Sequence, residues 1–422
     1  MKESFLHYIW QYQYFNKSEL KTEDGEDLNI LFPGKYNLES GPDFHFGKIM
    51  LGSRQWIGQI EIHINSSDWY AHKHQFDPAY EQVILHVVWK HNREVHRMDG
   101  SLIPVLELSS RVDPDLRDRT MEFLSSLNRL PCINHLDSLN RKRIKAMIAK
   151  AFERRMLRKA IEYENIWFSA QQDWQECFYR VFLRAFGFGL NTAAFDRLWQ
   201  LIPFRLLRRL IHDPFSLESI LFGQSGLLSS ARGTYAQDLR QEYSYLSYKF
   251  NLKEPISLHE WKFSRMRPSN FPALRIAQFA GIIHRRPGIF NDFEGSDLKE
   301  LYKILKAKPS DYWKNHYMFG KTTGQKTPAL GKDSMNSLLI NTIVPMLLFK
   351  GEYKNVNSLT AKAKALIHSI PAEKNRVTRM WTHAGIDSSN AFETQGLYAL
   401  YQHFCKPRKC LQCDVGTGIL SK

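Results

Sequence analysis

The fold of the first part of this chain is decided by residues 40–89, which read SGPDFHFGKIMLGSRQWIGQIEIHINSSDWYAHKHQFDPAYEQVILHVVW. Carboxylates and imidazoles recur here between segments with strand-like alternation. Residues 55–64 alternate between apolar and polar side chains, so Glu61 and His63 share one face of a predicted strand. A solvated loop would not need so many histidines beside carboxylates. The stretch therefore predicts a chemical site on a sheet.

The composition sets broad limits on the class of protein. A chain of 422 residues is long enough for two or three domains, and its 43% hydrophobic content indicates a globular protein. The formal net charge of +15 favours a polyanionic partner, nucleic acid before membrane, with ordinary surface solvation as the alternative. No apolar run approaches the ~20 residues of a membrane span, and the first residues lack a signal-peptide core, so we expect a cytoplasmic protein.

The secondary-structure pattern changes along the chain. After a helix predicted at 3–20, the chain shows short strand patterns that are predicted at 28–34, 43–51, 55–64, 83–89 and 102–108. The last of these is expected to return from a hairpin through Asp99-Gly100. From about Asp113, long helical patterns follow. The predicted fold class is α+β or α/β, with an N-terminal α/β domain (1–112), a basic helical domain (113–388) and a C-terminal helix with a cysteine-rich knuckle (389–422).

The order of elements in the first domain carries a resemblance to a known superfamily. The order is helix, strand, strand, strand, helix, strand, with Pro42-Asp43 followed 18 residues later by Glu61-Ile62-His63. This resembles the core of the PD-(D/E)xK nucleases, which have the restriction-endonuclease-like αβββαβ fold. The resemblance implies that Asp43 and Glu61 ligate Mg²⁺ or Mn²⁺. Hard carboxylate oxygens suit these cations, which can lower the pKa of a bound water.

The sequence departs from that pattern at His63, which stands where the superfamily has a lysine. A neutral imidazole could act as a base or as a third metal ligand, and would shift the preference toward Mn²⁺, Zn²⁺ or Fe²⁺. Lys48 on the preceding strand could supply the missing charge, as migrated lysines do in that superfamily. His72 and His74 lie in the next loop and could close over the site as ligands. The structural alternative is a turn aspartate beside a solvent-facing strand glutamate. Trp69 could stack a base or pack in the core.

Basic residues gather in the predicted helical domain. Within Arg141–Lys159 there are nine lysines or arginines and one acid, Glu153. A second group surrounds the segment RMRPSNFP at 265–272, which leads into a predicted helix. Such helices could track a phosphate backbone, or the arginines could cap helices and fix loops. The residues predicted to contact nucleic acid are Arg141, Lys142, Arg143, Arg154, Arg155, Arg158, Arg265, Arg267 and Arg275.

The C-terminal cysteines predict a soft-metal site. Cys405, Cys410 and Cys413 have CxxxxCxxC spacing, and three thiolates this close are typical of metal binding. A fourth ligand stays open between His403, Cys132 and an external group. With His403 the metal would be structural Zn²⁺, and with Cys132 either Zn²⁺ or a [4Fe–4S] cluster. The latter order resembles the iron–sulfur nucleases of recombination and of CRISPR adaptation, although the spacing differs.

Over nearly its full length the chain resembles a family of bacterial proteins known as a domain of unknown function. The resemblance rests on GPDFHFGKI, GQIEIHINSSDWYAHKH, DPAYEQVILHVVW, LPCI, RPSNFP and CLQC. It implies relatedness and supplies no activity. From the residues we predict a metal-dependent nuclease acting on DNA or RNA. The alternatives are a metal-dependent hydrolase of a small substrate and a catalytically inactive nucleic-acid-binding scaffold.

Overall fold

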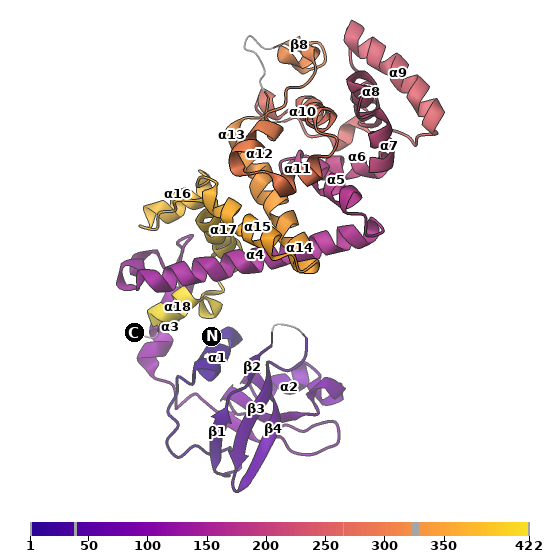
Figure 1. Cartoon of the computed structure of the whole chain (residues 1–422). Helices are drawn as coiled ribbons and strands as arrows, with labels where there is room; N and C mark the ends of the chain where they lie inside the picture. Colours follow the sequence, from indigo (N-terminus) through magenta and orange to yellow (C-terminus); the bar gives the residue numbers. More distant parts are fainter. Residues whose placement is uncertain (1, 38–39, 265, 323–328, 421–422) are drawn as a thin grey trace. The chain divides into compact units, whose positions relative to one another are not determined.

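The structure is a computed structural model that describes residues 2–37, 40–264, 266–322 and 329–420. The chain forms two compact units. The first comprises Met1–Met147 and Leu400–Lys422, and the second comprises Ile148–Ala399. Strands dominate the beginning of the chain and helices the remainder (Figure 1). The predicted order, a mixed α and β region followed by a helical region, is confirmed.

The first unit contains a six-stranded sheet, and short helices precede, interrupt and follow its strands in the sequence. Its elements up to the second unit are α1 (Glu3–Tyr12), β1 (Leu28–Phe32), β2 (Lys35–Tyr36), β3 (Phe44–Leu51), β4 (Arg54–Asn65), α2 (Asp68–Ala71), η1 (His74–Phe76), η2 (Pro78–Tyr80), β5 (Val83–Lys90), β6 (Val105–Glu107), α3 (Pro114–Ser125) and η3 (Ile133–Ser138). The chain returns to this unit as η8 (Tyr401–Cys405), η9 (Cys410–Gln412) and α18 (Asp414–Leu420).

The sheet is mixed, with the strand order β1-β3-β4-β5-β6 and with β2 paired to β3. The pairs β1–β3 and β3–β4 are antiparallel, whereas β4–β5 and β5–β6 are parallel. The segment from α2 to η2 makes the crossover between the parallel strands β4 and β5. The register aligns Glu61 with His86 on the neighbouring strand. A buried carboxylate and a buried imidazole are therefore brought to adjacent strands at the centre of the sheet.

The predicted hairpin through Asp99-Gly100 is wrong in its strand direction. A tight turn does form there, with Gly100 at φ 80° and an isolated antiparallel bridge between His96 and Leu102. The chain then crosses over, and β6 pairs parallel to β5, with Val105 opposite His86. Alternation of apolar residues specifies the faces of a strand but not its direction, so the sequence pattern could not separate the two arrangements.

The first helix is shorter than the predicted 3–20. It ends at Tyr12 because Gln13 adopts a left-handed conformation, with φ 55°, and its backbone N–H caps the carbonyls of Ile9 and Trp10. The buried side chains of α1 include Phe5 and Ile9, as its amphipathic pattern requires. The Trp10 indole N–H donates to the carbonyl of Pro33 at 2.9 Å, which anchors the helix to the loop after β1.

The second unit is mainly helical, with one small two-stranded sheet of β7 (His316–Met318) and β8 (Lys321–Thr322). The long helix α4 (Arg141–Ser169) begins in the first unit and continues into the second. The helices after α4 are α5 (Trp174–Ala185), α6 (Thr192–Leu201), α7 (Phe204–Leu210), α8 (Pro214–Gln224), α9 (Thr234–Phe250), α10 (Pro272–Arg285), α11 (Ile289–Gly295), α12 (Leu298–Leu305), α13 (Lys332–Leu338), α14 (Val344–Tyr353), α15 (Asn357–Ser369), α16 (Arg376–His383) and α17 (Ala391–Leu400). Short 3-10 helices form η4 (Leu258–Glu260), η5 (Pro268–Asn270) and η6 (Asp311–Lys314), and the π-helical segment η7 (Leu339–Ile343) joins α13 to α14.

Among the described residues, no helix combines the length and the apolar character that crossing a membrane requires.

Candidate metal centre

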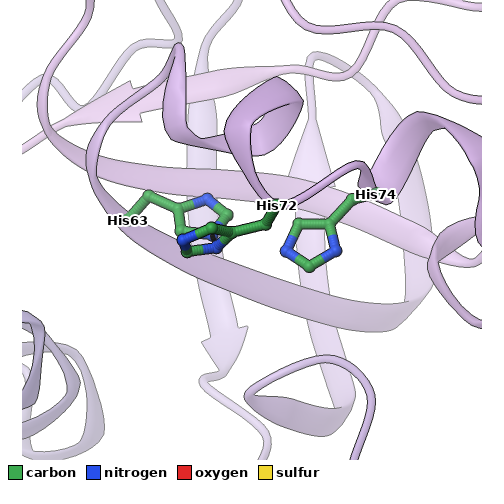
Figure 2. Close-up of side chains that lie close together, drawn as sticks. All are labelled: His63, His72 and His74. Atoms are coloured by element: carbon green, nitrogen blue, oxygen red, sulfur yellow. Dashed lines mark hydrogen bonds between the residues drawn. The ribbon is translucent and has the colours of Figure 1, made fainter.

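Three histidines from the crossover and from β4 gather in the first unit (Figure 2). His63 lies on β4, His72 follows α2 directly, and His74 begins η1. Between the last two, Lys73 adopts a left-handed conformation with φ 63°, which lets both neighbouring imidazoles reach β4. One ring nitrogen from each of the three histidines lies within 4.8 Å of the others. His63 is buried, His74 is half-buried and His72 is exposed, so the group opens to solvent on one side.

Glu61 lies beside this triad and contacts two of its members, and we call the four residues Glu61, His63, His72 and His74 the histidine site. Glu61 Oε1 lies 3.5 Å from His63 Nε2 and 3.5 Å from His74 Nε2. His63 Nε2 and His72 Nδ1 are 3.0 Å apart. A tetrahedral cation with ligand distances of about 2.0–2.2 Å separates its ligand atoms by roughly 3.4 Å. The observed separations fit such a cation.

Asp43 is held beside Glu61 by reciprocal hydrogen bonds. The Asp43 backbone N–H donates to Glu61 Oε2 at 3.1 Å, and Asp43 Oδ2 accepts the Ile62 N–H at 3.1 Å. The same Oδ2 lies 3.2 Å from His7 Nε2 of α1, and His7 Nδ1 is 3.2 Å from the Tyr36 hydroxyl. The structure thus brings together Asp43 and Glu61. Asp43 is tied to the backbone of β4 and to α1.

Burial gives the titratable groups of the site unusual pKa values. Burial, followed by the nearby Asp43 carboxylate, raises the pKa of Glu61 to about 9. Burial also lowers the pKa of His63 to about 2, with His86 as the next cause, and lowers the pKa of His74 to about 4. Without a cation, the acid is protonated and these two imidazoles are neutral at pH 7. Neutral imidazole is the form of histidine that binds metals.

A buried nitrogen of the histidine site without a hydrogen-bond partner indicates that these residues fit a metal ion. His74 Nε2 is buried and has no hydrogen-bond partner, although it points toward Glu61. Buried polar atoms are normally satisfied, so a nitrogen left without a donor or acceptor needs an explanation. A cation bound between Glu61 and the three imidazoles would satisfy this nitrogen.

His86 supports the site from behind. It is fully buried on β5, and its Nε2 lies 2.8 Å from His63 Nδ1. Metal-binding histidines usually pair their second nitrogen in this way, which fixes the ring orientation. A histidine on a buried strand is more often a hydrogen-bonded core residue, and His86 combines that role with contact to a candidate ligand. Burial lowers the pKa of His86 to about 3.

Other residues that the sequence singled out near the site lie outside the histidine site. Lys48 is exposed on β3 opposite Ile57, four residues before Glu61, which is about 13 Å along a strand. Trp69 is buried, with its ring 5.3 Å from that of His74, and its indole N–H donates to the His96 carbonyl at 3.2 Å. Trp69 therefore forms part of the wall of the site.

His7 and Tyr36 are contacts of the site that the sequence reasoning did not identify. A signal for His7 was present, because Glu3 and His7 are four residues apart and share one face of α1. Burial raises the pKa of Glu3, and the neighbouring His7 lowers it. For Tyr36, on a two-residue strand, no comparable pattern exists in the sequence.

The basic residues predicted to contact nucleic acid divide into exposed and internal groups. Arg155 donates to Gln395 at 2.6 Å and to Asn341 at 3.0 Å, and burial lowers its pKa. Arg275 is 3% exposed on α10. Arg143 is exposed, and its guanidinium donates to the Asp414 carbonyl at 2.7 Å. The remaining described members are also exposed: Arg141, Lys142, Arg154, Arg158 and Arg267. Arg265 lies outside the described residues.

The comparisons with known proteins identify a family. The chain matches the family model described as "Protein of unknown function (DUF2851)" over residues 3–376, and it belongs to this family. No curated protein and no solved structure matches the chain.

Proposed function

We propose that this protein is a metal-dependent hydrolase that cleaves phosphodiester bonds of nucleic acids, with the histidine site as its metal centre. The observation that carries the proposal is a buried carboxylate 3.5 Å from two imidazoles, with a third imidazole 3.0 Å from one of them. One of these imidazoles, that of His74, has a buried nitrogen without a hydrogen-bond partner. Such groups at these separations are the usual ligands of catalytic transition metals.

The ligand set favours particular metals. Imidazole nitrogens suit Zn²⁺, Mn²⁺ or Fe²⁺, whereas Mg²⁺ prefers oxygen ligands and keeps several waters. Three of the four groups in the histidine site are imidazoles. We therefore propose Zn²⁺ or Mn²⁺ rather than Mg²⁺, a narrower choice than the carboxylate motif alone supports. The exposed side at His72 leaves room for a water or a substrate oxygen.

The sheet supports a nuclease reading of the site. Three antiparallel strands, β1, β3 and β4, are followed by a short helical crossover and the parallel strand β5. This order is compatible with the resemblance to PD-(D/E)xK nucleases, which implies one acid at the start of the second strand and one on the third. Asp43 and Glu61 would be those two acids, and hydrogen bonds join the Asp43 carboxylate to β4 and the Glu61 carboxylate to the Asp43 backbone.

Each residue of the site would have a distinct role. The cation would be held by Glu61, His63, His72 and His74, and His86 would fix the orientation of the His63 ring. Asp43 fixes the backbone of β4 and can accept a proton or orient a water. When bound, the cation lowers the pKa of a coordinated water and stabilises the developing charge on the phosphate.

The charge distribution favours a polyanionic substrate. The net charge is +15, and six of the described residues predicted to contact phosphate are exposed. Around Arg158, partial burial and the like charges of Arg155 and Arg154 lower the guanidinium pKa. A bound phosphate would relieve that repulsion, so this face of α4 favours an anion.

The test is cleavage of labelled single- and double-stranded DNA and RNA with Zn²⁺, Mn²⁺ or Mg²⁺. We expect cleavage with Zn²⁺ or Mn²⁺, lost in Glu61→Gln and in Asp43→Ala. Glu26→Gln, an exposed glutamate in the same unit, is the matched control and should retain activity. Cleavage that survives Glu61→Gln would contradict the site. Salt-sensitive binding without cleavage under any condition would favour an inactive binding protein.

A second candidate is hydrolysis of a small substrate at the same site. It is favoured by the deep burial of Glu61 and His63, 5% and 1% exposed, which leaves only the His72 side open. In that case activity should be insensitive to added polyanions, and binding to nucleic acid should lack a steep salt dependence. A competition assay with unlabelled DNA distinguishes the two candidates.

A further inference from the structure

Four of the five cysteines belong to the first unit, and all four are buried. Cys132 precedes η3, and the other three lie in the returning C-terminal segment as Cys405, Cys410 and Cys413. Each is 6% exposed. The fifth, Cys177, is a core residue of the second unit, where its Sγ lies 3.8 Å from the Tyr163 carbonyl. More than 250 residues of chain separate Cys132 from the other three.

Specific contacts bring the C-terminal segment to the region of Cys132. The Arg408 guanidinium donates to the Asn128 carbonyl at 2.6 Å. Helix α18, which follows Cys413, packs against η3, which follows Cys132. Helix α18 also approaches η9 closely, because a Cβ at Gly416 would lie 2.2 Å from the Cys410 carbonyl oxygen. Glycine at this position permits the contact.

The four thiols are close enough to influence one another's charge. Burial, followed by the nearby thiols of Cys413 and Cys410, raises the pKa of Cys132 to about 12. Burial also raises the pKa of Cys405, with Cys132 as the next cause. A buried structural thiol is inert and needs no such neighbours. A soft cation would reverse the effect, because it binds and stabilises thiolates.

We propose that Cys132, Cys405, Cys410 and Cys413 together bind one metal centre in the first unit. The site would fasten the C-terminal segment to the region between α3 and η3, across the long stretch of chain that forms the second unit. A metal bound by four thiolates contributes directly to folding, because the ligands are far apart in the unfolded chain.

Four thiolates suit two kinds of occupant. They hold structural zinc, with Zn–S distances of about 2.3 Å, and they also hold iron–sulfur clusters. Analysis of bound metal and sulfide distinguishes the two.

The cysteine centre also connects to the histidine site. The Gln412 side-chain amide, beside Cys413, donates to the Tyr36 hydroxyl at 3.4 Å. Tyr36 in turn contacts His7, which lies beside Asp43. A metal bound by the four cysteines would therefore fix the position of Gln412, at one end of this series of contacts. The proposal itself does not depend on whether the histidine site cleaves nucleic acid.

The experiment is metal analysis of the full-length protein purified without oxygen, with iron, zinc and acid-labile sulfide measured per chain. Wild type is compared with Cys410→Ser, with Cys177→Ser as the matched control and with His63→Ala. Metal lost only in Cys410→Ser supports the four-cysteine centre: iron with matching sulfide would identify it as a cluster, and one zinc without sulfide would identify it as a structural zinc site. Loss of metal only in His63→Ala would assign it to the histidine site and overturn the proposal.

Because Cys410→Ser could fail to fold, the wild-type protein provides an independent test. X-ray absorption at the metal edge should show about four sulfur ligands for each zinc, or sulfur coordination with short iron–iron contacts for a cluster. A metal bound by nitrogen and oxygen alone, or protein purified without metal and with four reactive thiols in the first unit, would overturn the proposal.

Discussion

Among the residues that the structure describes, each unit buries one glutamate deeply, and the two differ in their partners. Glu61 on β4 is 5% exposed, and Glu218 on α8 is 2% exposed. Glu218 Oε2 accepts the Tyr235 hydroxyl at 2.6 Å and the Trp313 indole N–H at 3.0 Å. Glu61 Oε1 faces His63 and His74, each 3.5 Å away.

Burial raises the pKa of both acids, so the direction of the pKa shift does not distinguish Glu61 from Glu218. Their contact partners do distinguish the two acids. The partners of Glu218 are a phenol hydroxyl and an indole N–H that donate to it, and these hydrogen bonds lower its pKa against the effect of burial. Glu61 instead faces imidazoles, one of which has a buried nitrogen without a partner. A buried acid with donors stabilises a fold, whereas a buried acid among neutral imidazoles is a candidate metal ligand.

The largest expected effect is on metal binding. Glu61→Gln removes the charged ligand of the histidine site, and we expect the affinity for Zn²⁺ or Mn²⁺ to fall about 100-fold or more, since losing even a supporting partner costs about 10–100-fold. Isothermal titration calorimetry measures this. Glu218→Gln is the matched control and should bind metal as the wild type does. Equal losses in both variants would remove the distinction between the two acids.

For the free energy of unfolding, we expect Glu218 to contribute more than Glu61, which reverses the order expected for metal affinity. Glu218→Leu leaves the buried donors of Tyr235 and Trp313 without their acceptor, which should lower the free energy of unfolding by about 2–5 kcal/mol. Glu61→Leu leaves one backbone donor, that of Asp43, and should cost about 1–3 kcal/mol in metal-free protein. Urea denaturation in the presence of a chelator tests the order. A larger loss for Glu61→Leu would show that the histidine site is mainly structural.

His86 tests the support behind the site. His86→Ala removes the partner of His63 Nδ1 without removing a ligand, so metal affinity should fall about 10–100-fold. His259→Ala, an exposed histidine of the second unit, is the control. A metal-binding titration of both variants gives the result. Unchanged affinity in His86→Ala would assign His86 to core packing alone.

The smallest expected effect is on the salt dependence of DNA binding, where exposed arginines should differ from buried ones. Arg154→Ala combined with Arg158→Ala should reduce the slope of log affinity against log salt for DNA by about 2, one for each phosphate contact. Arg275→Met, which removes the charge, should leave the slope unchanged, because that side chain is buried against Asn270, Ser334 and Gln278. Filter binding across a salt series measures the slopes. A reduced slope in Arg275→Met would contradict its assignment as internal.

Local sequence signals predicted much of the sheet and of the site. The alternation in residues 55–64 predicted β4 and the shared face of Glu61 and His63. The spacing of Asp43 and Glu61 predicted their approach, which the hydrogen bonds between them show. The position of Lys48 could not be read in the same way, because it depends on the strand register across the bulge in β3.

The sequence did not predict the helices α8 and α16, and the physical reason differs between them. The residues of α8 from Ser216 to Gln224 are all buried, so the helix lacks the polar face that produces helical periodicity. For α16 a signal was present: Asn375 and Thr378 form a capping box at its start. The contact of His7 with Asp43 depends on how α1 docks onto the sheet, which no local pattern encodes.

The most direct test of the metal centre is a crystal structure of the full-length protein soaked with Zn²⁺, with anomalous difference density recorded at the zinc edge. We predict a peak about 2.0–2.2 Å from Glu61 Oε1 and from nitrogens of His63, His72 and His74. The peak should disappear in Glu61→Gln crystals and remain in Glu218→Gln crystals. Zinc density absent from this group, or present with Glu61 hydrogen-bonded elsewhere, would contradict the account.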